Sequence, residues 1–289
     1  MSVTPTIIRF CHDTWSMSSS VQMLVCEPKL CYVVTQATPF HPMSHIWPDH
    51  PADRGLLDEY PVVDCQVGAV DMSTQRLFIG RDIPVRRNQD GWRFVVVHCI
   101  ENTEVSLSVG QQVSLKVDKS YQQALSRGHS AGHIASLALN KVLAEQGYWR
   151  KDAERKDTHG YYDFNSYAQQ TSIVSEEQCL DTYRLGKTLR KRGLNSAEFL
   201  SDIKGVEERI NSQIAQWLTL GSDISIKCCG ETLTDSRYWQ CDLGEGKLAE
   251  MPCGGTHARS LKEYTQIRVE LTCLDEQSIE MKTLAFAAK

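Results

Sequence analysis

The chain has 289 residues, a formal net charge of −5 at pH 7, 41% hydrophobic residues and 23% charged residues. This composition is typical of a globular protein long enough for two domains. The acidic balance argues against a broad, non-specific nucleic-acid surface, and no apolar run is long enough to span a membrane. We therefore expect a cytoplasmic protein with no membrane partner and no secretory signal; the composition leaves its oligomeric state open.

The residues before about 115 predict a small β-barrel or sandwich, because short β-branched apolar runs alternate there with turn signals. A segment rich in Pro, His and Asp, residues 40–58, interrupts these runs and is predicted to be a structured loop. The runs cover residues 23–26, 31–36, 61–71, 76–80, 92–100 and 113–118. The pattern changes near Ser120, so we place the domain boundary near residue 118, giving domains 1–118 and 119–289.

The second domain mixes helical and strand patterns. Apolar residues recur with helical period over residues 121–146, and Gly147 is a suitable terminator. Gly128 and Gly132 interrupt this helix, which indicates the close approach of another group such as a substrate. Further helices are predicted at 175–191 and 196–218, and strands at 160–164, 223–228, 265–274 and 278–286. The fold class is therefore α+β after an N-terminal β-barrel.

Two residue pairs with the spacing of metal ligands stand far apart in the chain. His129 and His133 form the first pair, in HSAGH, and Cys253 and His257 form the second, in CGGTH. An i, i+4 spacing on a helix puts both side chains on one face, about 5–6 Å apart at Cβ. Three imidazoles and one thiolate are the ligands that Zn²⁺ prefers. The four residues therefore predict a zinc site.

The residues between Cys253 and His257 favour a catalytic site over a structural one. Four protein ligands could close a tetrahedral site, whereas a catalytic site keeps one position for water. Gly254 and Gly255 let the backbone approach a ligand and expose N–H donors, so we consider both as substrate-binding residues.

No catalytic acid or base is assigned. Asp163 and Glu250 are candidates for proton transfer, but we favour their interpretation as surface or capping carboxylates; His98, in VVVHCI, is interpreted as a strand or core histidine rather than a ligand. Eleven cysteines occur without a CxxC pair, so we expect them to be reduced, most as small buried apolar residues.

HSAGH followed by CGGTH resembles the ligand pattern of the editing domain shared by alanyl- and threonyl-tRNA synthetases. The chain most resembles the stand-alone alanyl-tRNA editing proteins, over most of its length. This resemblance implies an N-terminal β-barrel, an α+β editing domain and Zn²⁺ held by the four residues named above. It also implies a hydrolase that cleaves the ester linking serine or glycine to alanine tRNA, with the aminoacylated acceptor end of the tRNA as its partner.

The resemblance implies a role for Thr38 in substrate binding, because Thr38, in TPFHP, matches a threonine that lies near the substrate amino acid. The loop that follows departs from the family pattern. Three glycines are replaced within residues 43–47, and His50 stands where a glutamine is expected, while the segment Pro51 to Gly55 is kept.

Two other functions remain open at this stage: hydrolysis of another small ester or amide after the substrate changed, and a non-catalytic, zinc-stabilised binding module. The basic run at residues 184–192 predicts either a patch that contacts phosphates or a solvated helix face.

Overall fold

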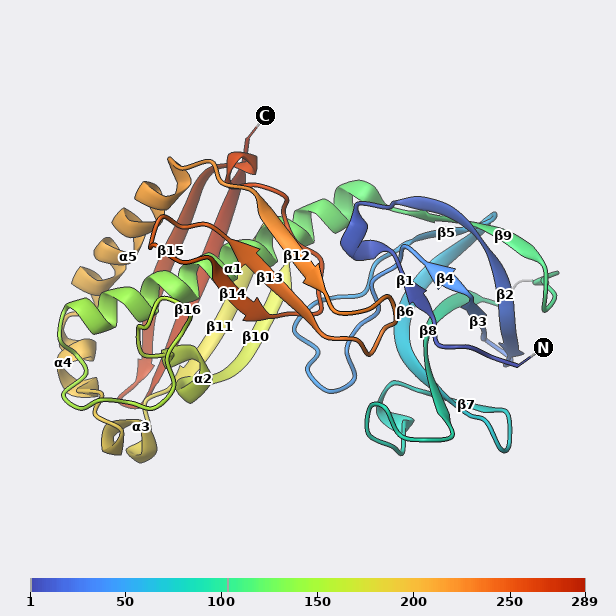
Figure 1. The fold of residues 1–289 in the computed structure, drawn as a ribbon, viewed down its shortest axis with the longest axis horizontal. Coiled ribbons are helices and arrows are strands. Elements are labelled where there is room, and N and C mark those ends of the chain that lie inside the picture. Colours follow the sequence, from blue (N-terminus) through green and yellow to red (C-terminus); the bar gives the residue numbers. More distant parts are fainter. Residues whose placement is uncertain (1, 103, 289) are drawn as a thin grey trace. The chain divides into compact units, whose positions relative to one another are not determined.

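The structure is a computed structural model that describes residues 2–102 and 104–288 (Figure 1). The chain forms two compact units. Unit 1 consists of Met1–Gln123, Cys228–Arg237 and Gly254–Thr256, and unit 2 of Ala124–Lys227, Tyr238–Cys253 and His257–Lys289. Two short segments from late in the chain thus return to unit 1.

Unit 1 is built around a sheet with the strand order β5-β9-β2-β3-β8-β6-β7. An additional pairing between β5 and β6 closes all of these strands except β7 into a ring. Its strands are β2 (Ser16–Cys26), β3 (Leu30–Thr35), β5 (Gly55–Leu57), β6 (Tyr60–Asp71), β7 (Arg76–Ile79), β8 (Trp92–Glu101) and β9 (Gln112–Val117). A separate parallel pair joins β1 (Ile7–Ile8) to β4 (Ala37–Thr38), and the short helices η1 (Phe10–His12) and η2 (Gly80–Asp82) complete the unit.

The predicted strands of the first domain are confirmed, although β2 begins seven residues before the predicted run 23–26, and the short strands β1, β4 and β5 have no predicted counterpart. Their alternating pattern places one side of β9 in the core, with Val113, Leu115 and Val117 buried and the residues between them exposed. Most of the predicted loop 40–58 lacks regular structure, except where β5 begins at Gly55.

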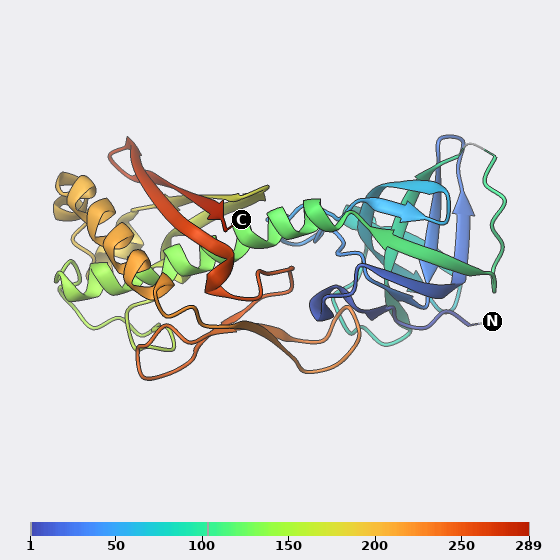
Figure 2. The ribbon, with the colours of Figure 1, turned by 90° about the horizontal axis from the view of Figure 1, so that it is seen from above.

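Unit 2 contains an antiparallel sheet with the order β10-β11-β16-β15 and a smaller sheet with the order β12-β13-β14 (Figure 2). The strands are β10 (Gln169–Ser175), β11 (Gln178–Arg184), β12 (Ile224–Cys228), β13 (Arg237–Cys241), β14 (Ala249–Pro252), β15 (Tyr264–Asp275) and β16 (Ser278–Ala287). The last residue of β12, Cys228, and the first of β13, Arg237, belong to unit 1. The helices are α1 (Lys119–Glu145), which begins in unit 1 and enters unit 2 at Ala124, α2 (Phe164–Ala168), α3 (Lys187–Lys191), α4 (Ser196–Ser201), α5 (Ile203–Leu218) and η3 (Leu261–Glu263). The predicted mixture of helices and strands is confirmed.

Helix α1 confirms the helix predicted over residues 121–146, and Gly147 follows it in a left-handed conformation with φ of +74°. The glycines inside α1 have a packing role. A Cβ at Gly128 would lie 2.6 Å from the backbone oxygen of Ser175, and one at Gly132 would lie 2.8 Å from Sγ of Cys179. The group that approaches α1 closely is therefore the β10–β11 hairpin, which packs against this helix.

Helix α5 packs against β15 in both views (Figures 1 and 2). The Asn211 amide fixes this contact, since its Nδ2 donates to the Val269 oxygen and its Oδ1 accepts from the Val269 nitrogen, both at 2.8 Å. The helix predicted over 196–218 is confirmed, although it is divided at Asp202 into α4 and α5.

Two predicted elements of unit 2 are wrong. The helix predicted at 175–191 is instead the end of β10, then β11, with only α3 helical. The strand predicted at 160–164 is absent, because Asp163 caps α2 by accepting a hydrogen bond from the Ser166 nitrogen at 2.9 Å. Capping therefore confirms the structural interpretation of Asp163.

The cysteines also differ from expectation. Cys26 and Cys31, opposite each other on β2 and β3, form a disulfide. Of the free cysteines, four are buried: Cys65, Cys99, Cys179 and Cys241. Nine of the eleven cysteines are therefore free, as expected, but the expectation that all are reduced fails for Cys26 and Cys31, and the expectation that most are buried is wrong. None of the helices described is long and apolar enough to cross a membrane.

Candidate metal centre

Unit 2 brings the two predicted ligand pairs together. His129 and His133 lie one helical turn apart on α1, and their ring centroids are 4.7 Å apart. Cys253 follows β14 directly, and His257 comes four residues later in an irregular segment. One ligand atom from each of the four residues lies within 4.8 Å of the others, so the cluster could hold a metal ion.

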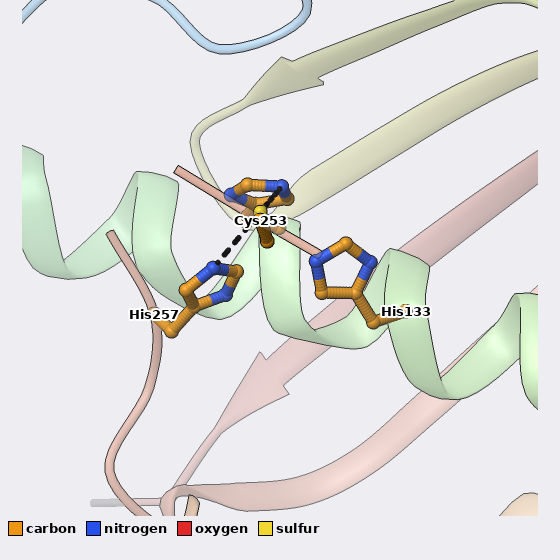
Figure 3. Close-up of side chains that lie close together, drawn as sticks. His133, Cys253 and His257 are labelled. Carbon is orange, nitrogen blue, oxygen red and sulfur yellow. Dashed lines mark hydrogen bonds between the residues drawn. The ribbon is translucent and has the colours of Figure 1, made fainter. Parts of the chain in front are cut away.

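The spacing of the ligand atoms suits a tetrahedral ion. The Cys253 Sγ lies 3.4 Å from Nε2 of His129 and 3.2 Å from Nε2 of His257 (Figure 3). Zinc bonds of about 2.0–2.3 Å at tetrahedral angles separate nitrogen and sulfur ligands by roughly 3.3–3.6 Å. The donor types of all four residues, and these two sulfur–nitrogen separations, therefore fit a tetrahedral ion such as zinc.

Ser130, which the sequence analysis did not single out, orients His257. Its hydroxyl oxygen is 3.1 Å from Nδ1 of His257 and accepts a hydrogen bond from the Ala258 nitrogen at 3.1 Å. When Nε2 of His257 serves as a metal ligand beside Cys253, Nδ1 carries the proton and donates to Ser130. Ser130 also hydrogen-bonds the Tyr264 phenol, whose O–H donates to the Arg127 carbonyl at 3.0 Å. Such an outer contact fixes the tautomer and the orientation of a ligand imidazole.

The glycines of CGGTH are placed differently from each other. Gly254 is exposed and Gly255 is buried, and the carbonyl oxygen of Gly254 accepts from Nη2 of Arg237 at 3.5 Å. A Cβ at Gly254 would lie 3.1 Å from that nitrogen, so the arginine occupies the space beside this residue. Among the described residues, neither glycine donates its backbone N–H to another protein group.

Thr38 is fully buried in unit 1, at the end of β4. Its hydroxyl lies 2.7 Å from Nε2 of His98 and accepts from the Phe40 nitrogen at 3.1 Å. His98 is also fully buried, with Nδ1 3.0 Å from the Val33 oxygen, and burial lowers its pKa to about 4. The prediction that His98 is a core histidine of a strand is confirmed. The substrate-binding role of Thr38 stays a prediction.

A second group of buried polar residues lies in the loop 40–58 of unit 1. His41 and Asp53 are joined through the backbone N–H of His41, which donates to Oδ2 of Asp53 at 2.7 Å. Gln122 also donates to this oxygen, at 2.5 Å. Burial raises the pKa of Asp53 to about 7, so the carboxyl is largely protonated below that pH. Nothing in the sequence indicates that Asp53 is buried, other than its position in the segment Pro51 to Gly55, which is kept from the family pattern.

His50 connects the same loop to the CGGTH motif. Its Nδ1 lies 2.8 Å from the Pro51 oxygen, so that nitrogen carries the proton, and Nε2 accepts from the Thr256 hydroxyl at 3.2 Å. Burial lowers the pKa of His50 to about 4, which keeps the ring neutral at physiological pH. His50, which departs from the family pattern, is thus hydrogen-bonded to Thr256, the residue directly before the predicted ligand His257.

Glu250, considered above as a carboxylate of the second motif, lies on β14 and accepts a hydrogen bond from Gln240 at 2.6 Å. It also forms an ion pair with Lys227 at 3.4 Å. These contacts agree with its interpretation as a surface carboxylate.

Comparison with known proteins agrees with the two motifs, although no family model matches the chain. The chain is 25% identical to the alanyl-tRNA editing protein AlaX-M of Pyrococcus horikoshii over 173 residues, which cover 60% of the chain and 61% of that protein. It is 26% identical to the alanine–tRNA ligase of Thermotoga maritima over 196 residues, 64% of the chain and 18% of the ligase. The match to the Methanosarcina mazei ligase is 33% over 75 residues, 25% of the chain and 8% of the ligase. The resemblance to alanyl-tRNA editing proteins is therefore confirmed.

Proposed function

We propose that this protein is a zinc-dependent hydrolase that removes serine or glycine from wrongly aminoacylated alanine tRNA. The observation that carries the proposal is the convergence of His129, His133, Cys253 and His257, with ligand atoms within 4.8 Å of one another. The resemblance to a protein named for alanyl-tRNA editing supports the choice of substrate.

The proposed reaction adds water to the ester carbonyl carbon and expels the ribose hydroxyl of the tRNA. When bound, zinc would supply Lewis-acid polarisation of the carbonyl or of a water molecule. The backbone N–H groups of Gly254 and Gly255 are proposed to donate to the oxygen that becomes negative, since they donate to no other described protein group. Ser130 holds His257 in the tautomer that a ligand imidazole needs.

The substrate side of the proposal rests on the resemblance alone. It assigns the amino-acid pocket to the region of Thr38, and the partner to the aminoacylated acceptor end of tRNA. The same proposal divides the chain into an N-terminal barrel domain, residues 1–118, and an editing domain, residues 119–289. Exposed Lys187, Arg190 and Lys191 on α3 would contact tRNA phosphates.

A second candidate is a non-catalytic, zinc-stabilised binding module. The observation that favours it is the complete set of four protein ligands, which could close a tetrahedral site with no position for water. A third candidate, hydrolysis of another small ester or amide, is favoured by the altered loop, where Ile46 and Trp47 are exposed in place of glycine.

One experiment separates these candidates. Protein purified without added metal is analysed for zinc, and deacylation of seryl-, glycyl- and alanyl-tRNA is measured with and without a chelator. We expect about one zinc per chain and hydrolysis of the seryl and glycyl esters that the chelator abolishes. The Cys253→Ala variant should lose this activity, while Cys273→Ala, at an exposed cysteine on β15, should keep it.

The other outcomes identify the alternatives. Stoichiometric zinc with no deacylation of any ester supports the binding module. Hydrolysis of a simple serine ester at the same rate as seryl-tRNA supports the small-ester hydrolase. Absence of zinc, with no uptake on its addition, contradicts all three.

A further inference from the structure

Two cysteines from opposite ends of the sequence face each other in unit 1. The N-terminal strand β1 runs antiparallel to the segment around residue 231, where Ile7 and Thr232 form a β-bridge and the Ile8 nitrogen donates to the Glu231 oxygen at 2.8 Å. Beyond Ile8 the chain leaves the strand and enters the short helix η1 (Phe10–His12), which carries Cys11, while the returning segment of unit 1 begins at Cys228. The two thiols do meet there, because their side chains hydrogen-bond to each other.

The contact is fixed by further interactions between the same two segments. The Arg9 guanidinium forms an ion pair with Glu231 at 2.8 Å, two residues before Cys11. The hydrogen bond between the two thiols holds their side chains in contact, and a disulfide requires Cβ atoms roughly 3.5–4.5 Å apart. A small local shift is therefore sufficient to join the two sulfur atoms.

The surroundings also make Cys228 a reactive thiol. Both cysteines are half-buried, so a small reagent can reach them. The hydrogen bond from Cys11 lowers the pKa of Cys228 to about 6, against the effect of burial, and electrostatic interactions with His12 and Arg237 act in the same direction as the hydrogen bond. A thiol whose pKa lies below neutrality is mostly thiolate at pH 7, and the thiolate is the form that attacks disulfides.

We propose that Cys11 and Cys228 form a redox-active dithiol that takes up small-molecule disulfides and is converted by them into an internal disulfide. The Cys228 thiolate attacks one sulfur of the reagent, forms a mixed disulfide and expels one thiolate, which takes a proton. The Cys11 thiolate, after giving its proton to solvent, then attacks the Cys228 sulfur and expels the second half of the reagent as a thiol. Two protein thiols are oxidised, and one small disulfide is reduced to two thiols.

This site is separate in sequence and chemistry from the zinc ligands, and none of the steps requires zinc or tRNA. It also differs from the Cys26–Cys31 disulfide, which links neighbouring strands β2 and β3. An internal Cys11–Cys228 bond would instead tie the N-terminal segment covalently to the returning segment Cys228–Arg237 of the same unit.

The test uses oxidised glutathione on the full-length, zinc-loaded protein, followed by mass spectrometry of the intact chain and of its peptides. The Cys229→Ser variant is used as the reference, because it removes the exposed neighbour of Cys228 and leaves a single cysteine at that point. We expect loss of two thiols without a retained glutathione, and a peptide cross-link between Cys11 and Cys228. In the Cys11→Ser variant the reaction should stop at the mixed disulfide on Cys228.

Matched variants make the result decisive. Cys228→Ser should abolish the cross-link, whereas Cys26→Ser, on a cysteine of the existing disulfide, should leave it intact. Cys228 should react at least about tenfold faster at pH 7 than exposed Cys273. Equal reaction rates for these two cysteines would overturn the proposal. So would a Cys11→Ser variant that carries no glutathione on Cys228, or oxidation that leaves Cys11 and Cys228 unlinked.

Discussion

Replacing Thr38 by valine tests whether this residue belongs to the core or to a substrate pocket. Valine keeps the shape of threonine and removes only its hydroxyl group. In the structure that hydroxyl serves two buried groups: it donates to Nε2 of His98 at 2.7 Å and accepts from the Phe40 nitrogen at 3.1 Å. The donor direction is fixed because Nδ1 of His98 donates to the Val33 oxygen, which can only accept.

The size of the effect follows from these contacts. His98 and Phe40 have no exposed surface, so water cannot replace the lost partner. A buried donor or acceptor without a partner costs about 1–3 kcal/mol, so two such groups should lower the free energy of unfolding by about 2–6 kcal/mol. Thr38→Ser keeps the hydroxyl and loses one methyl group, for which about 1 kcal/mol is expected. Urea denaturation of the two variants and the parent protein measures the difference.

Enzyme assays on the same proteins separate the two roles. The resemblance predicts that Thr38→Val changes the ratio of seryl to alanyl ester hydrolysis, because the hydroxyl would contact the substrate. The structure predicts that Thr38→Val lowers the free energy of unfolding by more than Thr38→Ser does. If valine destabilises by less than about 0.5 kcal/mol, the buried hydrogen bonds do not have the assigned role. If the hydrolysis ratio is also unchanged, Thr38 is not a pocket residue.

Three further predictions concern other parts of the molecule. Ser130→Ala should weaken zinc binding about 10–100-fold in a chelator competition. The control Ser136→Ala, at another buried serine of α1, should leave the zinc affinity unchanged. Equal zinc affinities of the two variants would contradict the role assigned to Ser130. Neutralising Lys187, Arg190 and Lys191 together should flatten the salt dependence of tRNA binding by about 2–3 units, and an unchanged slope would assign α3 to a merely solvated face. Burial raises the folded-state pKa of Asp53 to about 7, so the contribution of this carboxyl to stability is lost as pH rises from about 4 to 7. Relative to the parent protein, the unfolding free energy of Asp53→Asn should therefore increase by on the order of 3 kcal/mol between pH 5 and pH 8. A difference that stays constant over this pH range would contradict the assignment.

The prediction of a helix in place of β11 has a physical cause. On β11 the inward positions are Cys179, Asp181 and Tyr183, all buried. A carboxylate at the middle position hides the alternation that identifies a strand. Asp181 is accommodated because Gln169 donates to it at 2.8 Å, and burial raises its pKa to about 6. Gln169, which compensates for the burial of Asp181, lies twelve residues earlier in the chain. The pattern of residues within β11 therefore does not show that Asp181 can be buried.

Strand β13 was missed for the same reason. Its inward positions are Arg237, Trp239 and Cys241, and the first of these is a buried arginine. The guanidinium donates to the backbone oxygens of Leu233 and Asp235 at 3.3 and 3.2 Å, so its charge is hydrogen-bonded inside the protein. A polar residue at an inward position is predicted to be exposed unless its partners are known, and the partners depend on the fold.

The metal ligands could be predicted because their signal is local. An i, i+4 pair needs only a helix or a short turn to bring two donors together, and that information lies within five residues. The contacts that orient the ligands have no such signal. Ser130 and His257 are 127 positions apart, and His50 and Thr256 are 206 positions apart. Each is an ordinary polar residue until the fold buries it beside its partner. Buried hydrogen bonds are costly to lose. Ser130 and His50, which belong to no recognisable motif, therefore hold His257 and Thr256 of the CGGTH motif in position.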